Sequence, residues 1–427
     1  MEILKQNEFI IEGTGKIIYD HSQDDARFQI SYNPQKVILK TFQMPLGHVF
    51  ASYGYGRFEG FIGGTNVKIK CSKIAFGLYD KDKYQTSFQI LEDLIIGDDV
   101  PFHVFKAKLF GIIIDVPEFR IGSYLISIKR FENFDEINSL KKYGCNLEEG
   151  EIVIKNFESK TIEKNVTIKM CKEICLMLSF ISGVKVFYNR CELTNDKKQS
   201  QKIMRINTAN IGSYNKGFLP QENIEKILPI FYENFSKMKP NEKKCLFTSI
   251  DYLNSKSNKY LEELILRVAQ IWEILSDTFL VEEVKNAKII IDLREVLKKT
   301  IREWHKNNKS NGIKDYDFSF IMGRVLTSLD WEKAIKKMEK LVEKENLNSE
   351  TIGLDFKTLV ELRNQIAHSG RFEKTGEEYQ NHYGEVYSSA LFGVRVLILK
   401  KLGYTGYIFR EQKFENIGDY IKIEENR

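Results

Sequence analysis

The spacing of apolar residues changes from a two-residue repeat to a 3.6-residue repeat part-way along this chain. Residues 9–135 contain short runs that alternate apolar and polar side chains, and residues 67–71 after Gly63-Gly64 are the clearest example. Alternation of this kind is typical of a β-strand with one face buried. Many short strands separated by turn-forming residues favour an antiparallel sandwich or barrel. We therefore expect a β-rich, sandwich-like N-terminal module.

Helical periodicity dominates the second half of the sequence. Residues 166–182 carry an apolar stripe that ends at Gly183, and residues 260–280 form a longer amphipathic run. Similar patterns follow at residues 289–304, 318–329, 331–345, 356–368 and 379–402. Apolar stripes on successive helices must be buried against one another, so this part predicts an all-α helical bundle.

The length and the distribution of polar residues predict a multidomain α+β protein. A chain of 427 residues is longer than one ordinary core accommodates. The stretch between residues 195 and 244 is polar and lysine-rich and contains Pro220, Pro229 and Pro240. We expect a β-rich module at residues 1–195, a polar connecting segment at 196–244 and an all-α domain at 245–427.

The sequence contains no sign of export, membrane insertion or metal binding. Its N-terminus lacks an apolar signal region, and no run of about 18 apolar residues occurs, so a cytoplasmic protein without a membrane span is expected. The six cysteines form no CxxC pair, and Cys171 and Cys175 lack further ligands nearby, which favours buried free thiols. Walker A, GxGxxG, HExxH and GxSxG motifs are absent. We expect neither a metal nor a cofactor.

Positive charge is concentrated between residues 285 and 314. The whole chain has a net charge of only +5, but this segment has nine Lys or Arg against three acids, a local excess of +6. Such a patch attracts phosphate backbones, although a solvated helix face has the same composition. The candidate RNA-binding residues are Lys298, Lys299, Arg302 and His305.

The helix expected at residues 356–368 places an arginine among apolar side chains. At about 100° per residue, one arc contains Phe356, Leu359, Val360, Leu362, Ile366 and Ala367. Arg363 falls inside this arc, while Asn364 and His368 lie one turn apart on its flank. A buried arginine requires a partner, either a carboxylate such as Glu273 or a substrate phosphate. A structural ion pair between two helices, with His368 at the helix end, remains the alternative.

The string Arg363-Asn364-Gln365-Ile366-Ala367-His368 resembles the Arg-x4-His motif of HEPN domains. It includes the Asn that often follows the Arg in that family, and it lies on a late helix. This resemblance covers about residues 245–405. The layout of the whole chain is similar to the ApeA-like anti-phage family, with further matches at residues 13–17, 53–60 and 176–183. Gly370 departs from toxin-type HEPN proteins, some of which carry Tyr there.

The resemblance implies a metal-independent endoribonuclease acting in abortive-infection defence. The substrate 2′-OH would attack the adjacent phosphorus, with His368 as general acid or base and Arg363 holding the phosphate. Asn364 would orient His368 or a phosphate oxygen. It also implies a homodimer, an RNA substrate for which tRNA is one candidate, and a phage-derived trigger sensed by the N-terminal module. The alternative is a non-catalytic RNA-binding or scaffold protein whose helical bundle serves dimerisation.

Overall fold

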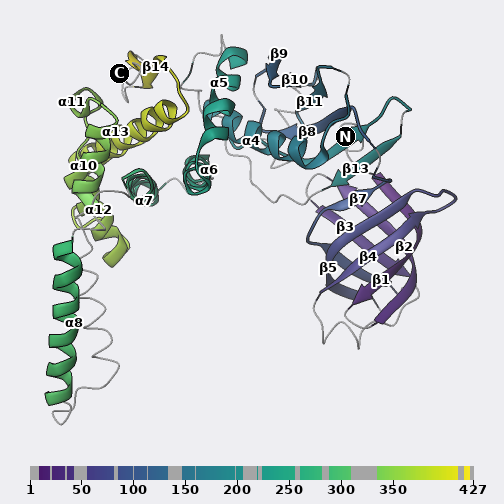
Figure 1. Ribbon diagram of the computed structural model, residues 1–427, viewed down its shortest axis with the longest axis horizontal. Helices are drawn as coiled ribbons and strands as arrows, with labels where there is room; N and C mark the ends of the chain where they lie inside the picture. The colour runs from purple at the N-terminus through teal and green to yellow at the C-terminus, as the bar shows by residue number, and fades with distance from the viewer. Residues whose placement is uncertain are drawn as a thin grey trace. The chain divides into compact units, whose positions relative to one another are not determined.

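The computed structural model divides the chain into two compact units (Figure 1). Unit 1 comprises Met1–Ser236, Asn254–Lys256 and Tyr407–Ile421, and unit 2 comprises Lys237–Leu253, Ser257–Gly406 and Lys422–Arg427. The structure describes residues 9–19, 22–33, 36–42, 55–80, 85–99, 101–112, 114–132, 147–158, 160–197, 199–204, 219, 224–254, 260–280, 288–308, 334–411 and 418–423. The combination of β-rich and helical parts confirms the α+β class.

Unit 1 contains a closed antiparallel barrel. Its strands are β1 (Phe9–Tyr19), β2 (Ser22–Asn33), β3 (Lys36–Phe42), β4 (Tyr55–Ile62), β5 (Lys68–Asp80) and β6 (Gln85–Ile90). They follow the order β4-β1-β2-β3-β6-β5, and pairing of β4 with β5 closes the ring. Of the sandwich or barrel that the strand pattern favoured, strands β1–β6 form the barrel rather than the sandwich-like arrangement, because β4 pairs with both β1 and β5.

Side chains fill the barrel interior. Phe28, Phe58 and Phe88 are almost fully buried there, and the rings of Phe28 and Phe58 meet edge-on with centroids 4.9 Å apart. Gly13 on β1 permits the close approach of β4, because a Cβ atom at this position would overlap the carbonyl oxygen of Phe61. The barrel centre is thus a hydrophobic core rather than a channel.

The sheet continues beyond the barrel through a short connecting strand. Its strands are β7 (Leu94–Ile96), β8 (Val104–Phe110), β9 (Val116–Ile121), β10 (Tyr124–Arg130), β11 (Gly150–Asn156), β12 (Phe187–Thr194) and β13 (Ser200–Met204). β7 pairs with β5 on one side and with β13 on the other, so it joins the barrel to the second part of the sheet. Helix α4 (Lys164–Ser182) is buried over most of its length and ends at Gly183, which has φ 67°.

The segment expected to be a polar connection, residues 196–244, contains regular structure. β13 lies within it, and so does helix α5 (Ile224–Lys237), whose Leu228 and Phe231 are fully buried. Tyr232 of α5 hydrogen-bonds to Glu173 of α4, and burial of this tyrosine raises its pKa. Abundant lysines at solvent-facing positions reduce the mean hydropathy of the segment and hide its apolar stripe.

Unit 2 is mainly helical. Its helices are α6 (Pro240–Asn254), α7 (Leu261–Phe279), α8 (Lys288–Asn308), α10 (Ala334–Lys344), α11 (Ser349–Ile352), α12 (Phe356–Ser369) and α13 (Glu377–Lys401). Helix α7 packs against α10, α12 and α13. Trp272 on α7 is fully buried, and its indole N–H donates a 3.0 Å hydrogen bond to the carbonyl of Ala390 on α13. These contacts make α7 the central helix of the group.

The helical expectation fails at the C-terminal end of the chain. Strands β14 (Gly406–Glu411) and β15 (Gly418–Ile423) form a two-stranded sheet there, so residues 245–427 are not all-α. The helix expected at residues 318–329 lies outside the described residues. No helix in the described part of the chain combines the length and the apolar character that crossing a membrane requires.

Candidate functional site

Helix α12 begins and ends where its sequence favours. Asp355 caps the N-terminus, and its carboxylate accepts hydrogen bonds from the backbone N–H of Thr358 at 2.9 Å and from the Thr358 hydroxyl at 2.6 Å. Burial alone would raise the pKa of Asp355, but the bonds from Thr358 outweigh it and hold that pKa below its ordinary value. Gly370, with φ 74°, ends the helix.

The apolar side of α12 is narrower than the sequence predicts. Phe356, Leu359, Leu362 and Ile366 are buried, as expected for the side facing the bundle. Ala367, at the edge of the expected arc, is exposed instead. Because the buried stripe is narrow, residues on its flank are only partly covered.

Arg363 falls within the buried stripe but is only partly covered, and it makes the contact expected from the sequence. Its side chain is 33% exposed, and Nη2 lies 3.0 Å from the carboxylate of Glu273 on α7. Nη1 donates a 2.8 Å hydrogen bond to Oδ1 of Asn364, the next residue on the same helix. Two contacts therefore hold the guanidinium plane, and they use only two of its five N–H donors.

His368 lies in the last turn of α12, one turn beyond Asn364. It is exposed, and its imidazole makes no hydrogen bond or ion pair with any residue that the structure describes. The structure therefore presents an accessible imidazole on the helix that carries Arg363 and Asn364, without a hydrogen bond between the imidazole and either residue.

Aromatic side chains cover the start of α13, close to the end of α12 in sequence. Phe372 lies against Tyr383 with ring centroids 4.6 Å apart, and His382 lies beside Tyr383 at 6.0 Å. His382 is exposed and close enough to Asp355 to lower its pKa. His382 is not among the candidate residues that the sequence analysis names. The four-residue spacing of Tyr379 and Tyr383 was the available signal for an aromatic cluster.

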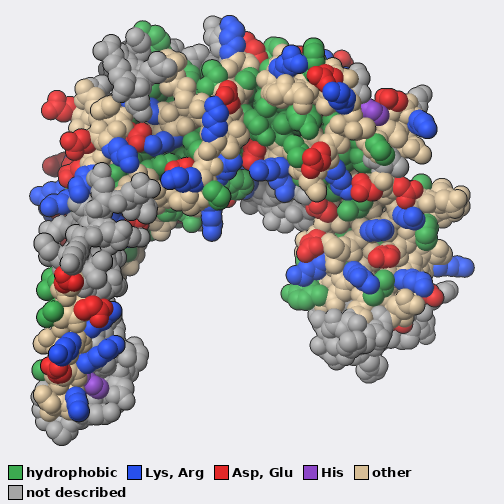
Figure 2. All heavy atoms as spheres, in the orientation of Figure 1, with side chains coloured by type: hydrophobic (Ala, Val, Ile, Leu, Met, Phe, Trp, Pro, Cys, Tyr) green, Lys and Arg blue, Asp and Glu red, His purple; other side chains and the backbone are tan. Residues whose placement is uncertain are grey.

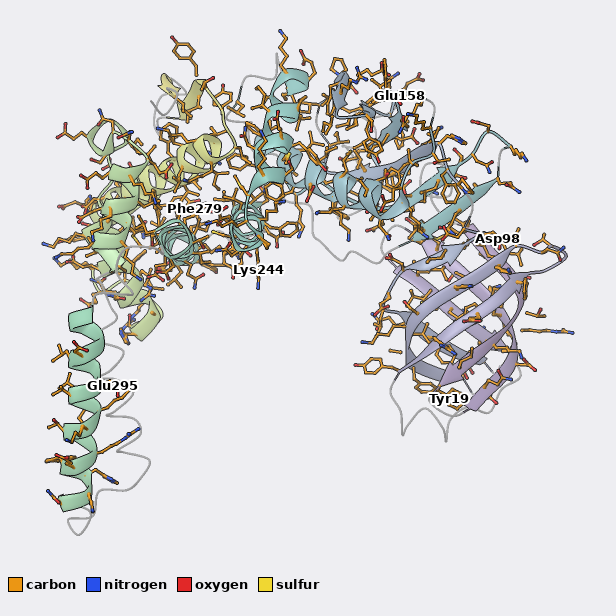
Figure 3. All side chains as sticks on the ribbon, in the orientation of Figure 1. Tyr19, Asp98, Glu158, Lys244, Phe279 and Glu295 are labelled. Carbon is orange, nitrogen blue, oxygen red and sulfur yellow. The ribbon has the colours of Figure 1, made fainter. Side chains whose placement is uncertain are left out.

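The residues proposed to bind RNA lie on α8 and not on α12. Lys298 forms an ion pair with Glu295 at 2.7 Å, while Lys299 and Arg302 are exposed and His305 is half-buried. Acidic and basic side chains are interspersed over α8 in Figure 2, and Glu295 is labelled on it in Figure 3. This mixture weakens the positive field that the local charge excess suggested.

The described cysteines offer neither a disulfide nor a reactive thiol. Cys71, Cys171, Cys175, Cys191 and Cys245 are buried free thiols, as expected, and Cys145 lies outside the described residues. Burial raises the pKa of Cys71 to about 11. Within the described ranges, no three His, Cys, Asp or Glu side chains gather closely enough to hold a metal ion.

No protein family model matches the chain, and neither the curated proteins nor the solved structures include a significant match. The chemistry of the side chains must therefore carry any functional argument.

Proposed function

We propose that the chain is a metal-independent endoribonuclease of the HEPN type that acts in anti-phage defence. The observation that carries this proposal is the arrangement on α12, where Glu273 and Asn364 hold Arg363 and an accessible His368 follows one turn later. A fixed guanidinium can hold a phosphate and an accessible imidazole can transfer a proton, and both roles serve phosphodiester transesterification.

In the proposed reaction the substrate 2′-OH attacks the adjacent phosphorus and the bond to the 5′-oxygen breaks. The products are a 2′,3′-cyclic phosphate and a 5′-hydroxyl end. His368 transfers a proton, because imidazole changes its charge near neutral pH. Arg363 donates its remaining N–H groups to the phosphate oxygens as negative charge develops. Asn364 keeps the guanidinium in place through its 2.8 Å hydrogen bond.

Both a base for the 2′-OH and an acid for the leaving oxygen are needed, and α12 supplies one imidazole. In the proposal, a homodimer brings two copies of His368 into one cleft around a two-fold axis. The exposed imidazole of His382 is the alternative source of the second group within one chain. RNA, with tRNA as a candidate, is the substrate, and the β-rich unit senses a phage-derived trigger.

A second function is favoured by one specific observation. The ion pair with Glu273 already compensates Arg363 without a substrate phosphate. This is the arrangement expected of a non-catalytic bundle that serves RNA binding or dimerisation, in which the pair joins α7 to α12. The two functions differ in what His368 contributes, since a scaffold has no need of a free imidazole.

The deciding experiment is cleavage of labelled RNA in EDTA by the wild-type chain and by His368→Ala and His382→Ala variants. The nuclease predicts cleavage in chelator with cyclic-phosphate ends and loss of activity in His368→Ala. Loss in His382→Ala as well, in a monomer, would replace the dimeric site by one within a single chain. Cleavage that requires Mg²⁺, or that survives removal of His368, would contradict the mechanism. No cleavage by any form, together with RNA binding, would favour the scaffold.

A further inference from the structure

Unit 1 contains a cavity of about 1060 Å³ at the junction of the barrel and the second part of the sheet. Asp98, labelled in Figure 3, lies at this junction and forms an ion pair with Lys68 at 3.5 Å. One wall comes from the barrel and is apolar, with Ile10, Ile62 and Val67. The volume is that of a site for a small organic molecule.

The opposite wall is a charged face of the sheet. Lys106 on β8 pairs in register with Glu192 on β12, and Glu192 pairs with Lys202 on β13. Directly paired residues of neighbouring strands point to the same side of a sheet, so the three side chains form one row lining the cavity. Two lysines flank a single glutamate in this row. None of the three forms an ion pair or side-chain hydrogen bond with another described residue.

The adjacent row is different, because its charges are compensated. Lys108 on β8 lies 2.6 Å from Glu151 on β11. Arg190 on β12 donates through Nη2 to Glu148 at 2.5 Å. Among the described residues that line the cavity, Lys106 and Lys202 are therefore the two cations without an acidic partner.

The two walls belong to one connected unit. β7 is hydrogen-bonded both to barrel strand β5 and to β13. The hydroxyl of Tyr32, a residue of the barrel core, donates to Glu148 at 3.4 Å, and the guanidinium carbon of Arg190 lies 5.8 Å from the centre of the Tyr32 ring. The ion pair of Arg190 with Glu148 is therefore anchored in the barrel, which ties the two walls of the cavity together within unit 1.

We propose that this cavity binds a small organic phosphate. The phosphate oxygens accept hydrogen bonds from Lys106 on β8 and Lys202 on β13, and the organic part lies against the apolar wall. An oxyanion with several oxygens uses donors on two different strands better than a single carboxylate does. This site is independent of the proposed nuclease site on α12, since every residue that lines it belongs to unit 1.

The test is isothermal titration of the full chain with three probes: ATP, decyl phosphate and inorganic phosphate. ATP represents nucleotides and decyl phosphate represents lipid headgroups. The proposal predicts that at least one of the two organic probes binds more tightly than inorganic phosphate, because only the organic probes contact the apolar wall. Binding should weaken as salt concentration rises. If neither organic probe binds more tightly than inorganic phosphate, the proposal is overturned.

Two sets of variants locate the binding. Lys106→Ala and Lys202→Ala should each weaken the binding about tenfold, the loss expected for one charge-assisted contact. Val67→Ser on the exposed rim should weaken the organic probes and leave inorganic phosphate unchanged. Lys129→Ala is the matched control, since Lys129 is exposed on the same sheet, pairs with Glu151 and does not line the cavity. An equal loss in Lys129→Ala, or none in the cavity variants, would refute the site.

Discussion

Replacing Glu273 by glutamine removes the charge that faces Arg363 while keeping the shape of the side chain. The ion pair between Arg363 and Glu273 is neither fully exposed nor fully buried, because its side chains are 33% and 26% exposed. Exposed ion pairs contribute about 0.2–1 kcal/mol, and breaking a fully buried pair costs about 3–5 kcal/mol. We expect Glu273→Gln to lower the free energy of unfolding of unit 2 by about 1–2 kcal/mol, since water screens part of the interaction.

The assay is urea unfolding followed by tryptophan fluorescence. All three tryptophans, Trp272, Trp304 and Trp331, belong to unit 2, so the signal reports on this unit. A double-mutant cycle with Arg363→Met isolates the pair from the other effects of each substitution. We expect a coupling energy of about 1 kcal/mol, smaller at high salt. A coupling below about 0.3 kcal/mol would refute the reasoning, because the 3.0 Å contact would then contribute nothing to the folded state.

Three further predictions concern single residues. Asp355→Asn should lower the free energy of unfolding at pH values above 3.8, the ordinary pKa of an aspartate carboxyl. The difference in unfolding free energy between wild type and variant should shrink as pH falls through the lowered pKa of Asp355 in the folded protein, and urea unfolding at several pH values measures this difference. Trp272→Phe should cost about 2–3 kcal/mol, because the hydrogen bond to Ala390 and part of the ring volume are lost, with unfolding monitored by circular dichroism. Gly13→Ala should cost about 1–3 kcal/mol and increase hydrogen exchange along β1 and β4. Gly64→Ala, at a turn with open space but φ 73°, should cost about 1 kcal/mol of backbone strain and leave exchange along β1 and β4 unchanged.

The helices of unit 2 were predictable because their apolar stripes are long. The expected range 356–368 matches α12 within one residue at its C-terminal end, and 260–280 matches α7 within one residue at each end. The N-cap residue Asp355 and the C-cap residue Gly370 also mark the two ends of α12 in the sequence. Such information is local, so one sequence is enough to read it.

Local sequence patterns did not predict that the barrel closes or where the helical region begins and ends. A strand that alternates polar and apolar residues does so equally in a sandwich and in a barrel, and the difference lies in the long-range pairing of β4 with both β1 and β5. Helix α5 was missed because lysines and glutamates surround its four buried residues. The cavity in unit 1 was equally hidden, since its lysines are separated by nearly a hundred residues in sequence.

The geometry of Arg363 bears on both functions proposed for the α12 site. If the Arg363 guanidinium were completely buried, it could contact Glu273 but not a substrate phosphate. If it were completely exposed, nothing would fix its orientation. The observed side chain is about two-thirds covered, held at Nη2 by Glu273 and at Nη1 by Asn364, with further N–H groups unused. In the nuclease Glu273 is then a positioning residue: Glu273→Gln should reduce cleavage by more than its effect on stability explains, and Glu273→Asp should restore part of it. In a scaffold, RNA binding or dimerisation should fall only in proportion to the loss of folded protein. Activity and stability measured on the same variants therefore separate the two functions.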